Sequence, residues 1–349
     1  MTDTLLSTPA GARIAIVGLG RMGMRHAEAA KRLGMTIVGV ADVSETALTA
    51  AAAEFGLPES ACFTDPGAML EAIRPEAVVI ATTAPSHCEL VLKAAQARVA
   101  YILCEKPMAA SLDEADAMLA ACRGSGSVLA INHQMRFMEQ YTAVKDLIGG
   151  DALGPLVTIL VAASNFGLAM NASHYFEMFR YMVDEPAETV QAWLEEDRLA
   201  NPRGPQFDDR SGRVLVRSAG EATMFMDLSA RAGWGIQVIY TCRHGQIVVD
   251  ELNGEMRVAS RKPEYRELPT SRYGMPVDIE NTRIAPADSV APTMEVWKAM
   301  FSGHDFPDGD VGRHALACLV AAHESHRVGA APVALDAPAM PRGQVFNWA

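Results

Sequence analysis

The feature that most constrains this chain is a glycine-rich loop near its start, which lies between a short apolar run and a helix-compatible stretch. The apolar run 13–17 is followed by six residues that fit the pattern G-x-G-x-x-G: Gly18, Leu19, Gly20, Arg21, Met22 and Gly23. Gly18 permits a tight turn, Gly20 lets the backbone approach a pyrophosphate, and Gly23 lets the helix pack closely on the strand. N–H groups at the start of the helix then receive anionic phosphates. The loop predicts a dinucleotide site.

An acidic residue ends the second apolar run, 36–41, and supports this interpretation. Asp42 stands about where a carboxylate hydrogen-bonds the adenosine ribose of a dinucleotide. The same carboxylate repels a 2′-phosphate, and the next four residues contain no Arg or Lys to attract one. We therefore expect NAD rather than NADP. The alternative is an ordinary glycine turn followed by a surface aspartate.

The first 132 residues alternate short apolar runs with helix-compatible segments. Expected strands are 13–17, 36–41, 77–81, 100–104 and 128–131, and expected helices are 21–33, 45–55, 86–97 and 112–123. The strands are continuously apolar, which is typical of a parallel sheet covered on both faces. Residues 1–132 are therefore predicted to form a doubly wound α/β Rossmann domain that binds NAD.

The pattern changes after Asn132. We expect a helix at 137–148, a strand at 156–164, a helix at 171–183, and alternating strands from 189 to about 260. A long loop at 263–292, a last helix at 311–328 and an extended tail follow. Residues 133–349 are therefore predicted to form an α+β domain for substrate binding and oligomerisation, on a mostly antiparallel sheet with one open face.

Composition excludes several classes of function. The 349 residues carry a net charge of −12 and no basic stripe, which argues against nucleic acid as a partner. No apolar run approaches the roughly 18 residues that span a bilayer, and residues 1–12 read as a disordered lead-in without a secretory signal. Six scattered cysteines indicate neither a zinc site nor a disulfide framework, so we expect a reducing, cytoplasmic compartment.

A lysine follows the expected strand 100–104, in the sequence Glu105-Lys106-Pro107. Ligands bind outside the carboxyl ends of parallel strands, so Lys106 is expected to point toward the nicotinamide. Desolvation there lowers the pKa of a lysine, which suits it to proton transfer. The alternative is a surface lysine before a proline turn.

These motifs together resemble the Gfo/Idh/MocA oxidoreductases. The resemblance covers nearly the whole chain, including Arg136-Phe137 and the stretch 149–156, and it is most specific before residue 133. It implies that Lys106 lies beside the substrate hydroxyl and the nicotinamide. Further cofactor contacts are expected from the turn after the fourth strand and from the Glu-Lys-Pro motif: Thr82, Thr83, Pro85, His87, Glu105 and Lys106. His87 either contacts the dinucleotide or caps a helix.

In that family a helix of the second domain commonly carries an Asp and, one turn later, a His that faces the nicotinamide. The matching residues here are Asn171 and His174, which share a helix face with Glu177. We expect His174 to be the general acid/base, with a pKa near operating pH. Asn171 can bind a hydroxyl but cannot take a proton, which leaves proton transfer to Lys106 and His174. Expected substrate contacts are Asn171, Glu177, Arg136 and Tyr175, although Glu177 could instead pair with an Arg of its own helix or orient His174.

Two other groups of residues receive ordinary structural interpretations. The His323, Glu324 and His326 cluster is expected on a solvated helix face and not at a metal. Methionines and phenylalanines near His174 are expected to fill the core. They are Met170, Phe176, Met178, Phe179 and Met182.

The leading hypothesis is an NAD-dependent dehydrogenase that acts on a secondary hydroxyl of a sugar, inositol or sugar derivative. One alternative is an enzyme that keeps NAD bound and cleaves glycosides through transient oxidation. The other is a non-catalytic NAD-binding regulator. A homodimer or homotetramer is expected through the open sheet face, where strands such as 222–230 present alternate apolar residues.

Overall fold

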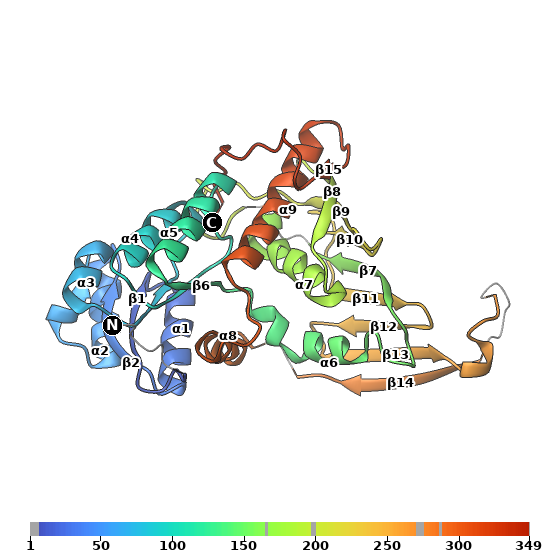
Figure 1. Cartoon of the computed structure of the whole chain (residues 1–349), viewed down its shortest axis with the longest axis horizontal. Coiled ribbons are helices and arrows are strands. Elements are labelled where there is room, and N and C mark those ends of the chain that lie inside the picture. Colours follow the sequence, from blue (N-terminus) through green and yellow to red (C-terminus); the bar gives the residue numbers. More distant parts are fainter. Residues whose placement is uncertain (1–6, 165–166, 197–199, 270–275, 286–287, 349) are drawn as a thin grey trace.

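The chain folds into two sheets with helices packed against them (Figure 1). The computed structural model describes residues 7–164, 167–196, 200–269, 276–285 and 288–348. Residues 1–6 of the expected lead-in lie outside this description. No helix within the described ranges is both long and apolar enough to cross a bilayer.

The first sheet contains six parallel strands in the order β3-β2-β1-β4-β5-β6. The strand order reverses between β1 and β4, which is the switch point where open α/β sheets bind ligands. The predicted Rossmann fold is therefore confirmed. Its strands are β1 (Arg13–Val17), β2 (Thr36–Ala41), β3 (Cys62–Phe63), β4 (Ala77–Ile80), β5 (Tyr101–Cys104) and β6 (Val128–Ile131).

Five helices follow these strands and cover the sheet. Side chains of Ser44, Asp65 and Ser111 cap three of them by accepting backbone N–H groups. Sequence reasoning missed β3 and α3 because both are short. The helices are α1 (Arg21–Arg32), α2 (Glu45–Phe55), α3 (Pro66–Ile73), α4 (His87–Gln96) and α5 (Leu112–Ser125).

A helix from the second half of the chain returns to the first sheet. Helix α8 (Val290–Ser302) lies beside α1 (Figure 1), and its Trp297 and Phe301 belong to the core on the α1 face of the sheet. Phe301 stacks on Tyr101 of β5 with ring centroids 4.0 Å apart. Long-range apolar burial therefore ties the two halves of the chain together.

The second sheet contains nine strands in the order β14-β13-β12-β11-β7-β10-β9-β8-β15. Strands β7 and β10 run parallel and the other neighbouring pairs are antiparallel, as predicted. They are β7 (Leu156–Ala163), β8 (Ala187–Leu194), β9 (Gly212–Ser218), β10 (Thr223–Asp227), β11 (Ile236–Cys242), β12 (Gly245–Asp250), β13 (Glu255–Arg261), β14 (Val277–Arg283) and β15 (Val333–Ala334).

Helices α7 (Ser173–Val183) and α9 (Gly309–Arg327) pack on this sheet, and α6 (Glu139–Leu147) leads into it. The core prediction for α7 is confirmed, because Phe176, Met178, Phe179 and Met182 are buried. Met170 precedes the helix and is only partly buried. The expected helix 171–183 begins as a π-helical turn, Leu168–Ala172, which contains Asn171.

The prediction of a continuous loop at 263–292 is wrong. A 3-10 turn (Pro263–Tyr265), strand β14 and the start of α8 lie in this stretch, of which residues 270–275 and 286–287 are outside the described structure. Strand β14 pairs with β13 at the edge of the sheet, and all seven of its residues are exposed. An edge strand with both faces exposed gives no alternating hydrophobic pattern, so the sequence carries no signal for it.

The prediction that the His323 cluster is solvated is also wrong for two of its members. Glu324 is buried, and the His323 ring packs against Phe346 and Trp348 with centroids 5.0 and 5.9 Å apart. The tail covers this part of α9, and a helix pattern alone does not show that contact. Among the described residues no group of His, Cys, Asp and Glu is arranged to hold a metal ion.

Candidate active site

The glycine loop connects β1 to α1 at the switch point of the first sheet. Gly18 has φ +88°, and a Cβ on Gly23 would lie 1.8 Å from the Gly18 carbonyl oxygen, so neither position accepts a side chain. A Cβ on Gly20 would instead meet open space, and no side chain caps α1. The loop therefore presents bare backbone and a free helix start, which suits the pyrophosphate of NAD. Leu19, Arg21 and Met22 complete this loop.

Asp42 lies directly after β2 and braces the same loop. Its Oδ2 accepts the Leu19 N–H at 2.7 Å, and its Oδ1 accepts the Ser44 N–H at 2.8 Å. The carboxylate is thus fixed at the carboxyl end of β2, where a ribose is bound in this fold. These residues fit NAD, and a negative charge held at this place disfavours the 2′-phosphate of NADP.

The turn after β4 places Thr82, Thr83 and exposed Pro85 at the same edge of the sheet. His87 behind them is fully buried, with Nδ1 3.0 Å from the Pro107 carbonyl oxygen and Nε2 3.3 Å from that of Thr82. Burial lowers the pKa of His87. The ring therefore ties the β4 turn to the β5 turn, and its side chain does not cap α4.

Glu105 follows β5 and is a buried carboxylate adjacent to Lys106 in the sequence. One oxygen, Oε1, lies 2.8 Å from His26 Nε2 on α1 and accepts the Asn132 side-chain amide at 2.8 Å. Burial by itself raises the pKa of Glu105, but His26, Lys106 and Asn132 together lower it to about 2. Glu105 is therefore a carboxylate that joins three elements of the Rossmann domain.

The side chain of Lys106 extends from the Rossmann domain toward the second domain. Its Nζ donates a hydrogen bond to the carbonyl of Met170, in the turn before α7. Burial lowers the pKa of Lys106 to about 8, against the opposing charge of Glu105. The expectation of a depressed lysine pKa is confirmed, and at neutral pH a measurable fraction of Lys106 is uncharged.

His174 lies on the first turn of α7, near His133. The two rings meet edge to face with centroids 5.4 Å apart. Burial and the charge of Lys106 lower the pKa of His174 well below its ordinary value, and they lower that of His133 to about 3. The expectation that the His174 pKa lies near operating pH is wrong for this structure, because the ring is buried beside a cation. The lowered pKa favours the neutral ring, which can form a hydrogen bond with a hydroxyl.

A cavity of about 350 Å³ lies against α7 and contains His174 and Asn171 in its wall. Glu251 also lines it and accepts hydrogen bonds from the hydroxyls of Tyr141 and Tyr175, at 2.7 and 2.9 Å. The wall therefore combines hydroxyl-binding groups with apolar surface. The described residues that line it are Met135, Met138, Gln140, Asn171, His174, Tyr175, Ile236, Glu251 and Leu252.

Two expected substrate contacts instead bind each other. Arg136 Nε donates to Glu177 Oε1 at 3.0 Å, and the side chains of both residues are 2% exposed. Arg136 Nη1 also lies 3.0 Å from Asp305, and its guanidinium is 4.8 Å from the Tyr181 ring centre. The pair joins the segment after β6 to α7, and neither member lines the 350 Å³ cavity.

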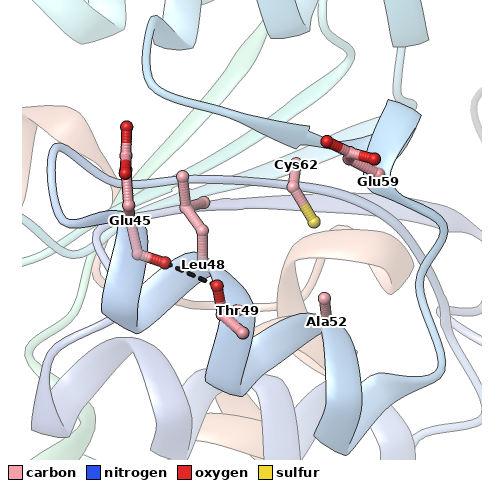
Figure 2. A pocket seen from close by; sticks show the side chains of 6 residues that line it. All are labelled: Glu45, Leu48, Thr49, Ala52, Glu59 and Cys62. Carbon is pink, nitrogen blue, oxygen red and sulfur yellow. Dashed lines mark hydrogen bonds between the residues drawn. The ribbon is translucent and has the colours of Figure 1, made fainter.

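A second cavity, of about 500 Å³, lies at the outer part of the Rossmann domain between α2 and β3 (Figure 2). Two carboxylates, Glu45 and Glu59, line it together with Leu48, Thr49, Ala52 and Cys62. Negative side chains repel phosphates. This cavity shares no lining residue with the predicted cofactor set and does not suit a dinucleotide.

Sequence reasoning missed three residues of the site. His133 lies two residues after β6, so its place at a strand end was an available signal. Asp209 and Glu251 reach the site through contacts with residues 39 to 110 positions away in sequence, and no local pattern marks them.

Comparisons with known proteins show the family of this chain. A model of an oxidoreductase family with an NAD-binding Rossmann fold matches residues 12–133. D-apiose dehydrogenase of Paraburkholderia graminis is 39% identical over 317 residues, which cover 87% of this chain and 80% of that protein. Myo-inositol 2-dehydrogenase of Thermotoga maritima is 28% identical over 242 residues, or 64% of this chain and 70% of the relative.

Solved structures share the fold over nearly the whole length. An Agrobacterium radiobacter oxidoreductase, in complex with NAD+, L-tartaric acid and magnesium, has a TM-score of 0.79 at 20% identity and covers 93% of this chain and 99% of its own. Levoglucosan dehydrogenase with NADH and levoglucosan has a TM-score of 0.78 at 19% identity, over 94% and 100%. Fold and site together define an NAD-binding oxidoreductase. The chain belongs to the Gfo/Idh/MocA family, as its sequence resemblance predicted.

Proposed function

We propose that this protein moves a hydride between NAD and a secondary hydroxyl or keto carbon of a sugar, inositol or sugar derivative. The observation that carries the proposal is the joint placement of Lys106 and His174, two groups able to exchange protons, next to a cavity lined with hydroxyl-binding side chains. The named relatives act on apiose and inositol, and a fold neighbour was crystallised with levoglucosan.

The proton is handled by Lys106 and His174. With a pKa of about 8, Lys106 can hold a hydroxyl proton or release it near neutral pH. The lowered pKa of His174 favours the neutral ring, which assists by accepting a hydrogen bond from the hydroxyl and orienting it. Asn171, in the same cavity wall, donates and accepts hydrogen bonds without exchanging protons. NAD, when bound, accepts or supplies the hydride.

The Gly18–Gly23 loop, Asp42, Thr82, Thr83 and Pro85 would hold NAD, with Glu105 and His87 fixing the turns behind it. Among the described residues that line the cavity there is no cation, although Lys106 lies nearby, and the lining includes the Glu251 carboxylate. A neutral polyhydroxylated substrate therefore fits better than a phosphorylated one, because a buried carboxylate repels an anion.

The test is turnover of purified protein with NAD+ and a panel of pentoses, hexoses, anhydrosugars and inositols, followed by NADH absorbance. We expect at least one polyol to be oxidised, and we expect His174→Asn to lower kcat by about 10²-fold. Failure of every polyol and every corresponding ketone would refute the proposal. Glycoside cleavage without added NAD+ would instead support the transient-oxidation alternative, and NAD binding without any turnover would support a regulator.

We also propose that two copies pack through the open face of the second sheet. Five apolar side chains form one continuous cross-strand row on this face: Val248, Ile239, Leu160, Phe225 and Leu215. Leu160 at its centre is 38% exposed. Such a row favours burial against a second copy, as a homodimer or homotetramer. We expect Leu160→Glu to reduce the mass measured by light scattering, whereas Val157→Glu on the same strand leaves it unchanged; an unchanged mass for Leu160→Glu would contradict the interface.

A further inference from the structure

A carboxylate that lies far from the other site residues in sequence binds the turn before α7. Asp209 precedes β9 and is 9% exposed. Its Oδ1 accepts the Ala169 N–H at 2.8 Å and its Oδ2 accepts the Met170 N–H at 2.8 Å. Lys106 donates to the carbonyl of that same Met170. Asp209 therefore binds the N–H group of Met170, and Lys106 binds its carbonyl group.

The backbone around Asp209 is shaped to admit this carboxylate. A Cβ on Gly167 would lie 1.9 Å from Asp209 Oδ2, so any larger residue there would displace the carboxylate. The Leu168 N–H donates to the Arg210 carbonyl at 2.9 Å. Residues 209 and 210 thus bind three consecutive N–H groups of the turn, and they leave its Met170 carbonyl facing Lys106.

The same segment is held from behind by the end of the described chain. The Asp208 N–H donates to the Asn347 carbonyl at 2.9 Å, and the Phe346 N–H donates to the Ala110 carbonyl at 2.9 Å. Trp348 is 1% exposed. Residues 346–348 therefore form a strap between the Asp209 segment and the stretch that follows the Glu105-Lys106-Pro107 motif.

The charges of Asp209 and Lys106 influence each other. Burial raises the pKa of Asp209 to about 6, while the N–H groups of Ala169 and Met170 and the charge of Lys106 oppose that rise. In return, the Asp209 carboxylate raises the pKa of Lys106, against the larger lowering by burial. The pKa of Lys106 is raised by the charges of Glu105 and Asp209 and lowered by those of Arg203 and Arg21. The charge of Lys106 in turn lowers the pKa of His133 and of His174.

We propose that Asp209 is the positioning residue for Lys106: it fixes the turn 167–170 so that the Met170 carbonyl holds the lysine at the substrate cavity, and the strap 346–348 holds Asp209 in turn. The catalytic use of Lys106 rests on the proposed function. The positioning itself concerns this chain's own residues and can be measured without turnover.

The test compares Asp209→Asn with Asp336→Asn, the same charge change at an exposed residue. We expect Asp209→Asn to lower kcat at least tenfold, to leave the Kd for NAD unchanged, and to move the Lys106 midpoint in the pH profile about one unit lower. Asp336→Asn should change none of these by more than a small fraction. Gly167→Ala should reproduce both effects, and Asp209→Glu should return the midpoint toward its original value by restoring the charge.

The Lys106 midpoint is also read from pH-dependent acetic anhydride labelling, quantified by mass spectrometry on the folded protein. This measurement distinguishes failure of the positioning from failure of the proposed function. If no polyol is turned over but the labelling midpoint falls in Asp209→Asn, the positioning stands and the proposed function fails. A folded Asp209→Asn protein whose labelling midpoint matches that of the unsubstituted protein would overturn the positioning.

Discussion

The nucleotide end and the substrate end of the site are built in different ways. At the nucleotide end, Arg13 to Asp42 form one β-α-β unit, and Asp42 accepts the N–H groups of Leu19 and Ser44, which lie 23 and 2 residues away in sequence. At the substrate end, Lys106 meets Met170, and Tyr175 meets Glu251. Each of these contacts joins segments more than sixty residues apart.

This difference indicates which part of the chain controls cofactor affinity and which part controls proton transfer. On the proposed function, cofactor affinity should depend mainly on the local unit from the glycine loop to Asp42, with further contacts from the turn after β4. Proton transfer should depend on how the second domain and α7 are held against the first, so we expect substitutions far from the reacting atoms to change it. Substitutions at the two ends should therefore separate NAD binding from turnover.

Among these variants, Lys106→Met is expected to show the largest loss of turnover without a loss of NAD binding. Removing the amine should lower kcat by about 10³-fold, because general acid–base catalysis contributes on that order. The Kd for NAD should stay within about twofold, measured by fluorescence titration, since the glycine loop is untouched. Lys31→Met, at an exposed helix position, is the control. A kcat loss below tenfold would show that proton transfer does not depend on Lys106.

Glu177→Leu tests whether a predicted substrate contact is structural. It leaves the Arg136 cation buried and without its main partner, which should cost about 3 kcal/mol in the free energy of unfolding. The double variant Arg136→Met/Glu177→Leu should recover most of that loss, because no charge is then left buried. Denaturant unfolding measures both. A stable Glu177→Leu protein with a raised KM would instead show that Glu177 contacts the substrate.

At the nucleotide end, Asp42→Ala should weaken NAD binding by about tenfold, since hydrogen bonds to a charged group contribute about 1.5 kcal/mol or more. The preference for NAD over NADP should fall at the same time, because the repelling carboxylate is gone. Calorimetry with both cofactors measures the two effects. Glu45→Ala, in the acidic cavity of Figure 2, should leave both affinities unchanged; a loss there would place the cofactor differently.

The smallest expected effect is the pH dependence of turnover. On the proposed function, oxidation would need uncharged Lys106 to take the hydroxyl proton, and burial lowers the pKa of Lys106 to about 8. The rate of oxidation should therefore rise roughly fivefold from about pH 7 to pH 8, while the rate of reduction, which needs the protonated form, falls. No midpoint for His174 should appear near neutrality, because burial keeps that ring uncharged. A flat profile for oxidation would contradict titration of Lys106.

Much of the site could be predicted, but for unequal reasons. The glycine loop, Asp42 and Lys106 follow parallel strands, so their place at the carboxyl edge is fixed by the order of elements. Glu177 was predicted as a substrate contact because it shares a helix face with His174, and Arg136 because a polyhydroxylated substrate needs several hydrogen-bonding groups. The structure buries them as an ion pair, and only the packing of α7 against the segment after β6 reveals this.

The sequence by itself determined the Rossmann fold, the preference for NAD and the lysine at its edge, because short-range hydrophobic periodicity and single glycine or acidic residues specify them. Tertiary structure alone decided the lowered pKa of His174, the ion pair of Glu177 with Arg136, and the positions of Asp209 and Glu251. The physical reason is that burial, charge proximity and long-range hydrogen bonds depend on residues brought together only when the two sheets pack.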